Sequence, residues 1–114
     1  MSDRKKAIPR ARMAASERDR RSRLARLMHG AGLLRGTLVL RERVCGKPNC
    51  RCRKGHKHLA LYVVASKRGR LRQLYVPKAW EPRVRQWVEQ YQEARRLLEE
   101  ISELYWDKAR TRQE

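Results

Sequence analysis

All three cysteines of the chain lie within eight residues, and two histidines follow them. The spacing is Cys45-x4-Cys50-x-Cys52, with His56 and His58 shortly after. Thiolate sulfur and imidazole nitrogen are ligands of structural zinc, and three cysteines with one histidine form a common tetrahedral set. Such clustering in an intracellular chain favours metal over a disulfide. The segment therefore predicts a zinc ion. The alternative is three free thiols near arginine.

The residues around the cysteines fit a metal loop. Residues 46–49, Gly-Lys-Pro-Asn, are typical of a tight turn that folds the first cysteine back toward the second. Three thiolates on Zn2+ leave a net negative site, which neighbouring cations stabilise. Five cations are available in this segment: Lys47, Arg51, Arg53, Lys54 and Lys57.

The charge of the chain is strongly positive and unevenly distributed. Its 114 residues include 30 Lys and Arg against 12 Asp and Glu, a net charge of +18. Residues 1–30 carry a net +7, residues 31–80 a net +12, and residues 81–114 a net −1. In residues 31–80 the one acid is Glu42. Because a compact body of this charge repels itself, an anionic partner is favoured, and nucleic acid fits best.

The cellular location follows from the absence of targeting patterns. No run of 18 apolar residues is present, which argues against a membrane partner. Residues 1–26 are rich in arginine and lack the apolar segment of a signal peptide. We therefore expect a cytoplasmic protein.

The hydrophobic pattern predicts an α+β fold. Residues 1–15 resemble a basic disordered arm, and residues 16–114 are expected to form a single small domain. A helix is predicted over residues 17–29, with arginines that we expect to be too polar to pack inward. Residues 37–76 predict a three-stranded antiparallel sheet that contains the metal loop 45–58. Its strands begin at Thr37, at Leu59 and at Leu71, and Gly69 lies in the turn of a hairpin.

The longest predicted element is a coiled-coil-like helix over residues 82–110. Its apolar residues follow heptad spacing: Val84, Trp87, Tyr91, Ala94, Leu98, Ile101 and Tyr105. We expect this helix to bury Trp87, Tyr91, Leu98 and Ile101. Because a small sheet cannot cover its length, we favour a homo-oligomer formed through residues 82–110. The competing interpretation is a hairpin within the chain against residues 17–29.

Residues 36–105 resemble a known family. The segments that carry the resemblance are GTLVLRERVCGKPNCRC, a following histidine, a tyrosine-containing strand, Tyr-Val-Pro and a long helix with LLEEISEL. They are similar to a small uncharacterised bacterial and archaeal family with a C-G-K-P-x-C-x-C motif, sometimes found near transposases. The resemblance implies His58 as the fourth zinc ligand rather than His56. Members usually continue with His-Gly-Pro-Tyr, whereas here Leu59-Ala60-Leu61 follows His58.

These patterns favour a zinc-stabilised protein that binds DNA or RNA, and a role as an accessory factor of a mobile element is compatible with them. The predicted contacts lie on the sheet and the metal loop: Arg41, Arg43, Lys47, Arg51, Arg53, Lys54, Lys57, Lys67, Arg68, Arg70 and Arg72. Tyr62 and Tyr75 are candidates for stacking bases, but residues of this kind on a small sheet more often belong to the core. The alternative function is an oligomeric adaptor that recruits an acidic partner protein.

We expect no enzymatic activity and no catalytic residues. Before residue 81 the acids are Asp3, Glu17, Asp19 and Glu42, scattered over predicted arm, helix and strand. A two-metal nuclease requires converging carboxylates. A zinc ion held by four protein ligands leaves no open position for a substrate.

Overall fold

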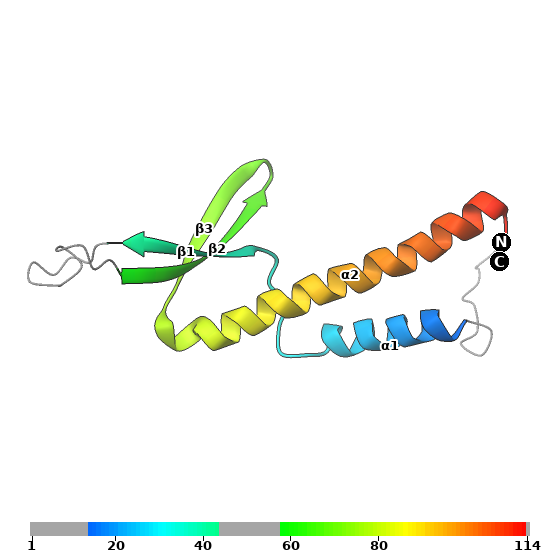
Figure 1. Cartoon of the computed structure of the whole chain (residues 1–114), viewed down its shortest axis with the longest axis horizontal. Helices are drawn as coiled ribbons and strands as arrows, with labels where there is room; N and C mark the ends of the chain where they lie inside the picture. The colour runs from blue at the N-terminus through cyan, green and yellow to red at the C-terminus, as the bar shows by residue number, and fades with distance from the viewer. Residues whose placement is uncertain (1–13, 44–57, 114) are drawn as a thin grey trace, which may run out of the picture. The chain divides into compact units, whose positions relative to one another are not determined.

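The computed structural model describes residues 14–43 and 58–113, which form two helices, three strands and a short 3-10 helix (Figure 1). The elements are α1 Ala15–Met28, β1 Thr37–Arg43, β2 His58–Lys67, β3 Arg70–Val76, η3 Lys78–Trp80 and α2 Glu81–Thr111. The predicted α+β class is confirmed, and the predicted bounds of the elements lie within two residues of those observed. Residues 1–13 of the predicted basic arm and residues 45–57 of the predicted metal loop lie outside the described residues.

The three strands form one antiparallel sheet in the order β1-β2-β3. Thr37 pairs with Val64 at one end of the β1–β2 ladder, and Arg43 pairs with His58 at the other. β2 and β3 form the predicted hairpin through a two-residue loop, in which φ is 54° at Arg68 and 79° at Gly69. Positive φ at both positions matches the right-handed twist of the paired strands. Glycine adopts this conformation without steric cost, which explains its place in the turn.

The chain forms two compact units. The sheet unit comprises Gly32–Tyr91 and therefore includes the first part of α2. The helix unit comprises the described residues of segments 1–31 and 92–114, and so contains α1 with the later part of α2. The described residues contain no helix that combines the length and the apolar content needed to span a membrane.

The core of the sheet unit lies between one face of the sheet and the first part of α2. Its buried members are Leu61, Val63 and Val76 of the sheet with Val84 and Val88 of α2. Leu34, Leu38 and Trp87 pack against this cluster and are partly buried. The backbone N–H of Leu34 also donates to the carbonyl oxygen of Trp87 at 3.1 Å. We call this covered side of the sheet the inner face.

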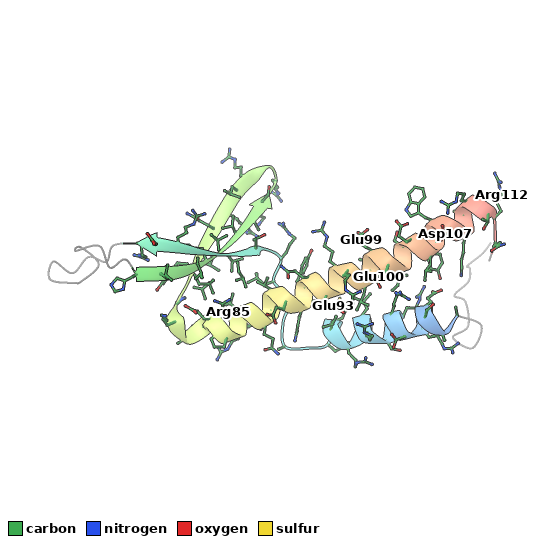
Figure 2. The ribbon with its side chains drawn as sticks, in the orientation of Figure 1. Arg85, Glu93, Glu99, Glu100, Asp107 and Arg112 are labelled. Carbon is green, nitrogen blue, oxygen red and sulfur yellow. The ribbon has the colours of Figure 1, made fainter. Side chains whose placement is uncertain are left out.

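The helix unit pairs α1 with the later part of α2, in agreement with the competing interpretation of an intrachain hairpin. Arg20 Nε donates to Glu100 Oε1 at 2.7 Å, and Arg23 donates to Glu93 Oε2 at 3.0 Å. Figure 2 labels Glu93 and Glu100 on α2. No arginine of α1 is buried, in agreement with the expectation that they are too polar to pack inward. Arg20 and Arg23 nevertheless form ion pairs, because α2 supplies acids at the matching positions. Self-association through residues 82–110 stays a prediction.

The buried face of α2 differs in part from the predicted heptad. Ile101 is buried as predicted, and Trp87 and Tyr91 are half-buried. The predicted burial of Leu98 was wrong, because its exposed fraction is 56% whereas that of the adjacent Leu97 is 0%. Position 97 lies four residues after Glu93 and three before Glu100, so these three side chains share one face of the helix. The face of α2 that forms ion pairs with α1 is therefore the face that carries residue 97.

Candidate nucleic-acid interface

The side of the sheet opposite the core carries two tyrosines and two arginines. Successive side chains of a strand point to opposite faces, so Tyr62, between the buried Leu61 and Val63, points away from the core. Tyr75 precedes the buried Val76 and is the cross-strand partner of Tyr62. The same alternation places Arg41 and Arg43 of β1 on this outer face. We call Arg41, Arg43, Tyr62 and Tyr75 the outer-face cluster.

The members of the outer-face cluster contact one another. The ring centroids of Tyr62 and Tyr75 lie 5.8 Å apart, with an interplanar angle of 64°. The guanidinium of Arg41 lies 5.8 Å from the centroid of Tyr62, and that of Arg43 lies 5.3 Å from the centroid of Tyr75. These distances are within the range of cation–π interaction. The cluster therefore joins positive charge to aromatic surface across all three strands.

The interpretation of the two tyrosines as core residues was wrong. Tyr75 is 46% exposed, Tyr62 is half-buried, and neither belongs to the buried cluster of the sheet unit. The alternation of β2 already contained the signal, because Leu61 and Val63 cannot share a face with the residue between them. Choosing between the two faces required knowledge of which one α2 covers.

A second group of cations lies at the turn of the hairpin. We call Lys67, Arg68, Arg70 and Arg72 the hairpin-tip cluster, and all four are exposed. Lys67 is the cross-strand partner of Arg70 and flanks the turn. Along β2 it lies nine residues from His58, which pairs with Arg43. At about 3.3 Å per residue this separation is roughly 30 Å.

The structure thus places the described members of the predicted contact set in two groups. The outer-face cluster lies toward the end of the β1–β2 ladder that leads into residues 44–57, and the hairpin-tip cluster lies at the other end of β2. The five cations from Lys47 to Lys57 lie outside the described residues. The nearest members of the two groups, Tyr75 and Arg72, are three residues apart on β3, which is roughly 10 Å.

The cations of the helix unit are in a different electrostatic environment. A hydrogen bond from Arg96 lowers the pKa of Glu93, and a hydrogen bond from Arg20 lowers the pKa of Glu100. Arg96 lies within ion-pair distance of both acids. Much of the positive charge of α1 is therefore neutralised inside the molecule, which the charge count by segment did not reveal.

Glu17 is the buried acid of this network, with an exposed fraction of 2%. Its Oε2 accepts hydrogen bonds from Tyr105 Oη and Arg21 Nε, each at 2.7 Å, and Lys108 Nζ lies 3.8 Å from its Oε1. Burial alone raises the pKa of Glu17, but the hydrogen bonds from Tyr105 and Arg21 and the nearby positive charges outweigh it. The net effect is a pKa below the ordinary value.

This environment predicts a loss of stability in acid. Because the pKa of Glu17 is lowered by folding, its ionised form stabilises the fold above about pH 4.3, the ordinary value for an unfolded glutamate. That contribution disappears as the pH falls through the lowered pKa. We expect the free energy of unfolding, measured with urea between about pH 7 and about pH 3, to decrease less steeply in Glu17→Gln than in the wild type. Parallel pH profiles for the two proteins contradict this role of Glu17.

The predicted zinc ligands fall largely outside the described residues. These are Cys45, Cys50 and Cys52, together with the alternative ligand His56. His58 is described as the exposed first residue of β2. Within residues 14–43 and 58–113, no group of three or more His, Cys, Asp or Glu side chains is placed to hold a metal ion. Zinc binding therefore stays a prediction.

Comparison with known proteins identifies a family without assigning an activity. No curated protein and no solved structure matches the chain. A family model described as a domain of unknown function, DUF6788, matches residues 11–86. The match includes α1, the sheet and the beginning of α2, and so extends further toward the N-terminus than the resemblance seen in the sequence. The chain is therefore a member of the DUF6788 family.

Proposed function

We propose that this protein binds nucleic acid through the cations of its sheet unit. The observation that supports the proposal most directly is the contrast between the two units. In the helix unit, arginines of α1 form ion pairs with acids of α2. Among the residues that the structure describes, no member of the outer-face or hairpin-tip cluster forms an ion pair with an acid. Cations without an internal counterion remain available to phosphates.

The geometry of the two clusters also fits a polymer better than a small anion. Their most distant members, Arg43 and Lys67, lie roughly 30 Å apart by the rise of a strand. By strand alternation, Arg70 and Arg72 share the face of Val76, opposite the outer-face cluster. A nucleic acid with phosphates spaced a few ångströms apart can therefore contact both clusters only by passing from one face of the sheet to the other. Arginine predominates in both, and its planar guanidinium makes paired hydrogen bonds with phosphate.

The proposal includes a structural zinc ion held by Cys45, Cys50, Cys52 and His58. Two facts support it: the donor types and spacing of the sequence, and the pairing of Arg43 with His58. That pairing brings the two strand ends that flank residues 44–57 next to each other, as a closed metal loop requires. A role as an accessory factor of a mobile element, suggested by the C-G-K-P-x-C-x-C motif, belongs to the same proposal.

Salt titrations with charge variants test nucleic-acid binding. We expect affinity for duplex or single-stranded DNA and RNA to fall by about a thousandfold between about 50 mM and 200 mM salt, because each phosphate contact releases condensed counterions. Replacing Arg68, Arg70 and Arg72 with Ala removes three contacts. It should weaken binding at about 50 mM salt by tenfold or more and reduce the slope of log affinity against log salt by about 2 to 3. Fluorescence anisotropy with labelled oligonucleotides measures both quantities.

The matched control removes the same charge from α2 and from the residue that follows it. Replacing Arg85, Arg95 and Arg112 with Ala also lowers the net charge by three, but these residues belong to neither cluster. We expect this variant to retain most of the affinity. Equal losses in the two triple variants contradict a specific surface. Binding to polyglutamate as tight as to any nucleic acid contradicts the proposal and favours the acidic-partner adaptor.

A further inference from the structure

We propose that the outer-face cluster is a stacking site for the bases of single-stranded nucleic acid. This inference rests on the proposed function and assigns its ligand class. The four side chains of the cluster occupy neighbouring positions on three adjacent strands. They combine the two groups that a single strand requires, which are aromatic rings for its bases and cations for its phosphates.

The aromatic surface of the outer-face cluster is exposed. Tyr75 lies on the edge strand β3, in register with Tyr62 of the central strand, and is 46% exposed. Among the described residues, no helix of the sheet unit covers this face, because the first part of α2 packs against Leu61, Val63 and Val76 on the other side. A tyrosine pair without a hydrophobic cover is placed to contact a ligand.

Each tyrosine ring of the cluster already contacts a guanidinium. Arg41 and Arg43 lie over Tyr62 and Tyr75, at 5.8 Å and 5.3 Å from the ring centroids. An exposed cation–π contact is weaker than the stacking of a base on an aromatic ring. A base can therefore replace a guanidinium on its ring. The released guanidinium, still attached to β1, then lies close to the phosphate that follows the base.

Single strands and duplexes differ in whether the faces of their bases are accessible to a side chain. In a duplex, each base stacks on its neighbours, so its face is unavailable to a side chain that approaches from outside. Unpaired bases expose that face, and sheets that bind single strands use it. The dimensions agree, since three strands at about 4.8 Å spacing span roughly 10 Å, enough for two stacked or splayed bases. Because every base has an aromatic face, we expect little sequence preference.

Binding of two matched oligonucleotides tests the stacking site in the full-length protein. One is a labelled oligothymidylate, and the other is an abasic strand of the same length and charge. We expect the oligothymidylate to bind at least tenfold more tightly at equal salt, because only it offers bases to the rings. We also expect the double variant Tyr62→Leu and Tyr75→Leu to bind both strands with the weaker affinity.

Two further variants separate stacking from a general effect on the sheet. Gln73→Leu changes an exposed residue two positions from Tyr75 on the same face of β3, and it should bind oligothymidylate like the wild type. Tyr75→Trp preserves an aromatic ring and should bind at least as tightly as the wild type. Circular dichroism confirms that each variant is folded, and the wild-type comparison of the two strands requires no substitution.

The outcomes distinguish this inference from the function on which it rests. Equal and salt-dependent affinities for the oligothymidylate and the abasic strand overturn the stacking site but leave nucleic-acid binding intact. Tight binding to duplex with weak binding to both single strands likewise overturns the stacking site and leaves nucleic-acid binding intact. Absence of binding to every strand at about 50 mM salt overturns both proposals.

Discussion

Leu97→Ala is expected to lower the free energy of unfolding by about 2–5 kcal/mol, the usual cost of removing a fully buried leucine side chain. Leu97 has an exposed fraction of 0% and lies on the face of α2 that packs beside α1 in the helix unit. The substitution leaves a cavity on this face of α2, which the partly exposed ion pairs with α1 do not compensate. Urea or thermal unfolding of the full-length protein measures the effect.

The adjacent leucine provides a matched control. Leu98 has the same chemistry and nearly the same position in the sequence, but it is 56% exposed. We expect Leu98→Ala to change the free energy of unfolding by about 0.5 kcal/mol or less, as is usual for exposed sites. If Leu98→Ala is the more costly substitution, then the predicted heptad describes the buried face of α2 in solution. In that case a second copy of the helix is the natural partner of Leu98.

Removal of zinc is expected to lower stability by several kcal/mol, because binding of a structural metal contributes directly to the free energy of folding. A chelator and the substitution Cys50→Ser should each produce this loss, and the two effects should not add. Metal analysis of protein prepared without added zinc should find about one ion per chain. A metal-free protein with the same melting temperature in chelator would falsify the zinc proposal.

The two histidines identify the fourth ligand in the same experiment. If His58 binds the metal, His58→Ala should reproduce much of the loss caused by Cys50→Ser, whereas His56→Ala should cost little. The reverse order assigns the site to His56. Because His58 is exposed at the start of β2, its side chain contributes little to the core of the sheet unit. A loss of stability in His58→Ala that disappears in the presence of chelator is attributable to the metal.

The elements of this protein could be predicted from local sequence because their signals are local. Alternation of period two from Thr37 onward, the glycine at position 69 and the uninterrupted helical pattern after Pro82 each require only neighbouring residues. The observed hairpin and the 31-residue helix α2 agree with these patterns. The cysteine cluster is also a local signal, since ligand types and spacing are properties of the sequence itself.

The faces of these elements were decided by the tertiary structure. Position 97 is buried rather than position 98 because Glu93 and Glu100 pair with Arg23 and Arg20, which are about seventy to eighty residues away in sequence. A charge count by segment cannot detect such compensation. It therefore overstated the cations that α1 offers to a partner.

The sheet shows the same division between sequence and structure. Alternation determines that Tyr62 and Tyr75 lie opposite Leu61 and Val76, but either face of an isolated sheet can be the covered one. Packing of Val84 and Val88 against Leu61 decides the question, because burying aliphatic side chains removes apolar surface from water. The tyrosines, each with a polar hydroxyl, remain on the outer face beside Arg41 and Arg43. The sequence thus determined which residues share a face, and the docking of α2 determined which face is left for a ligand.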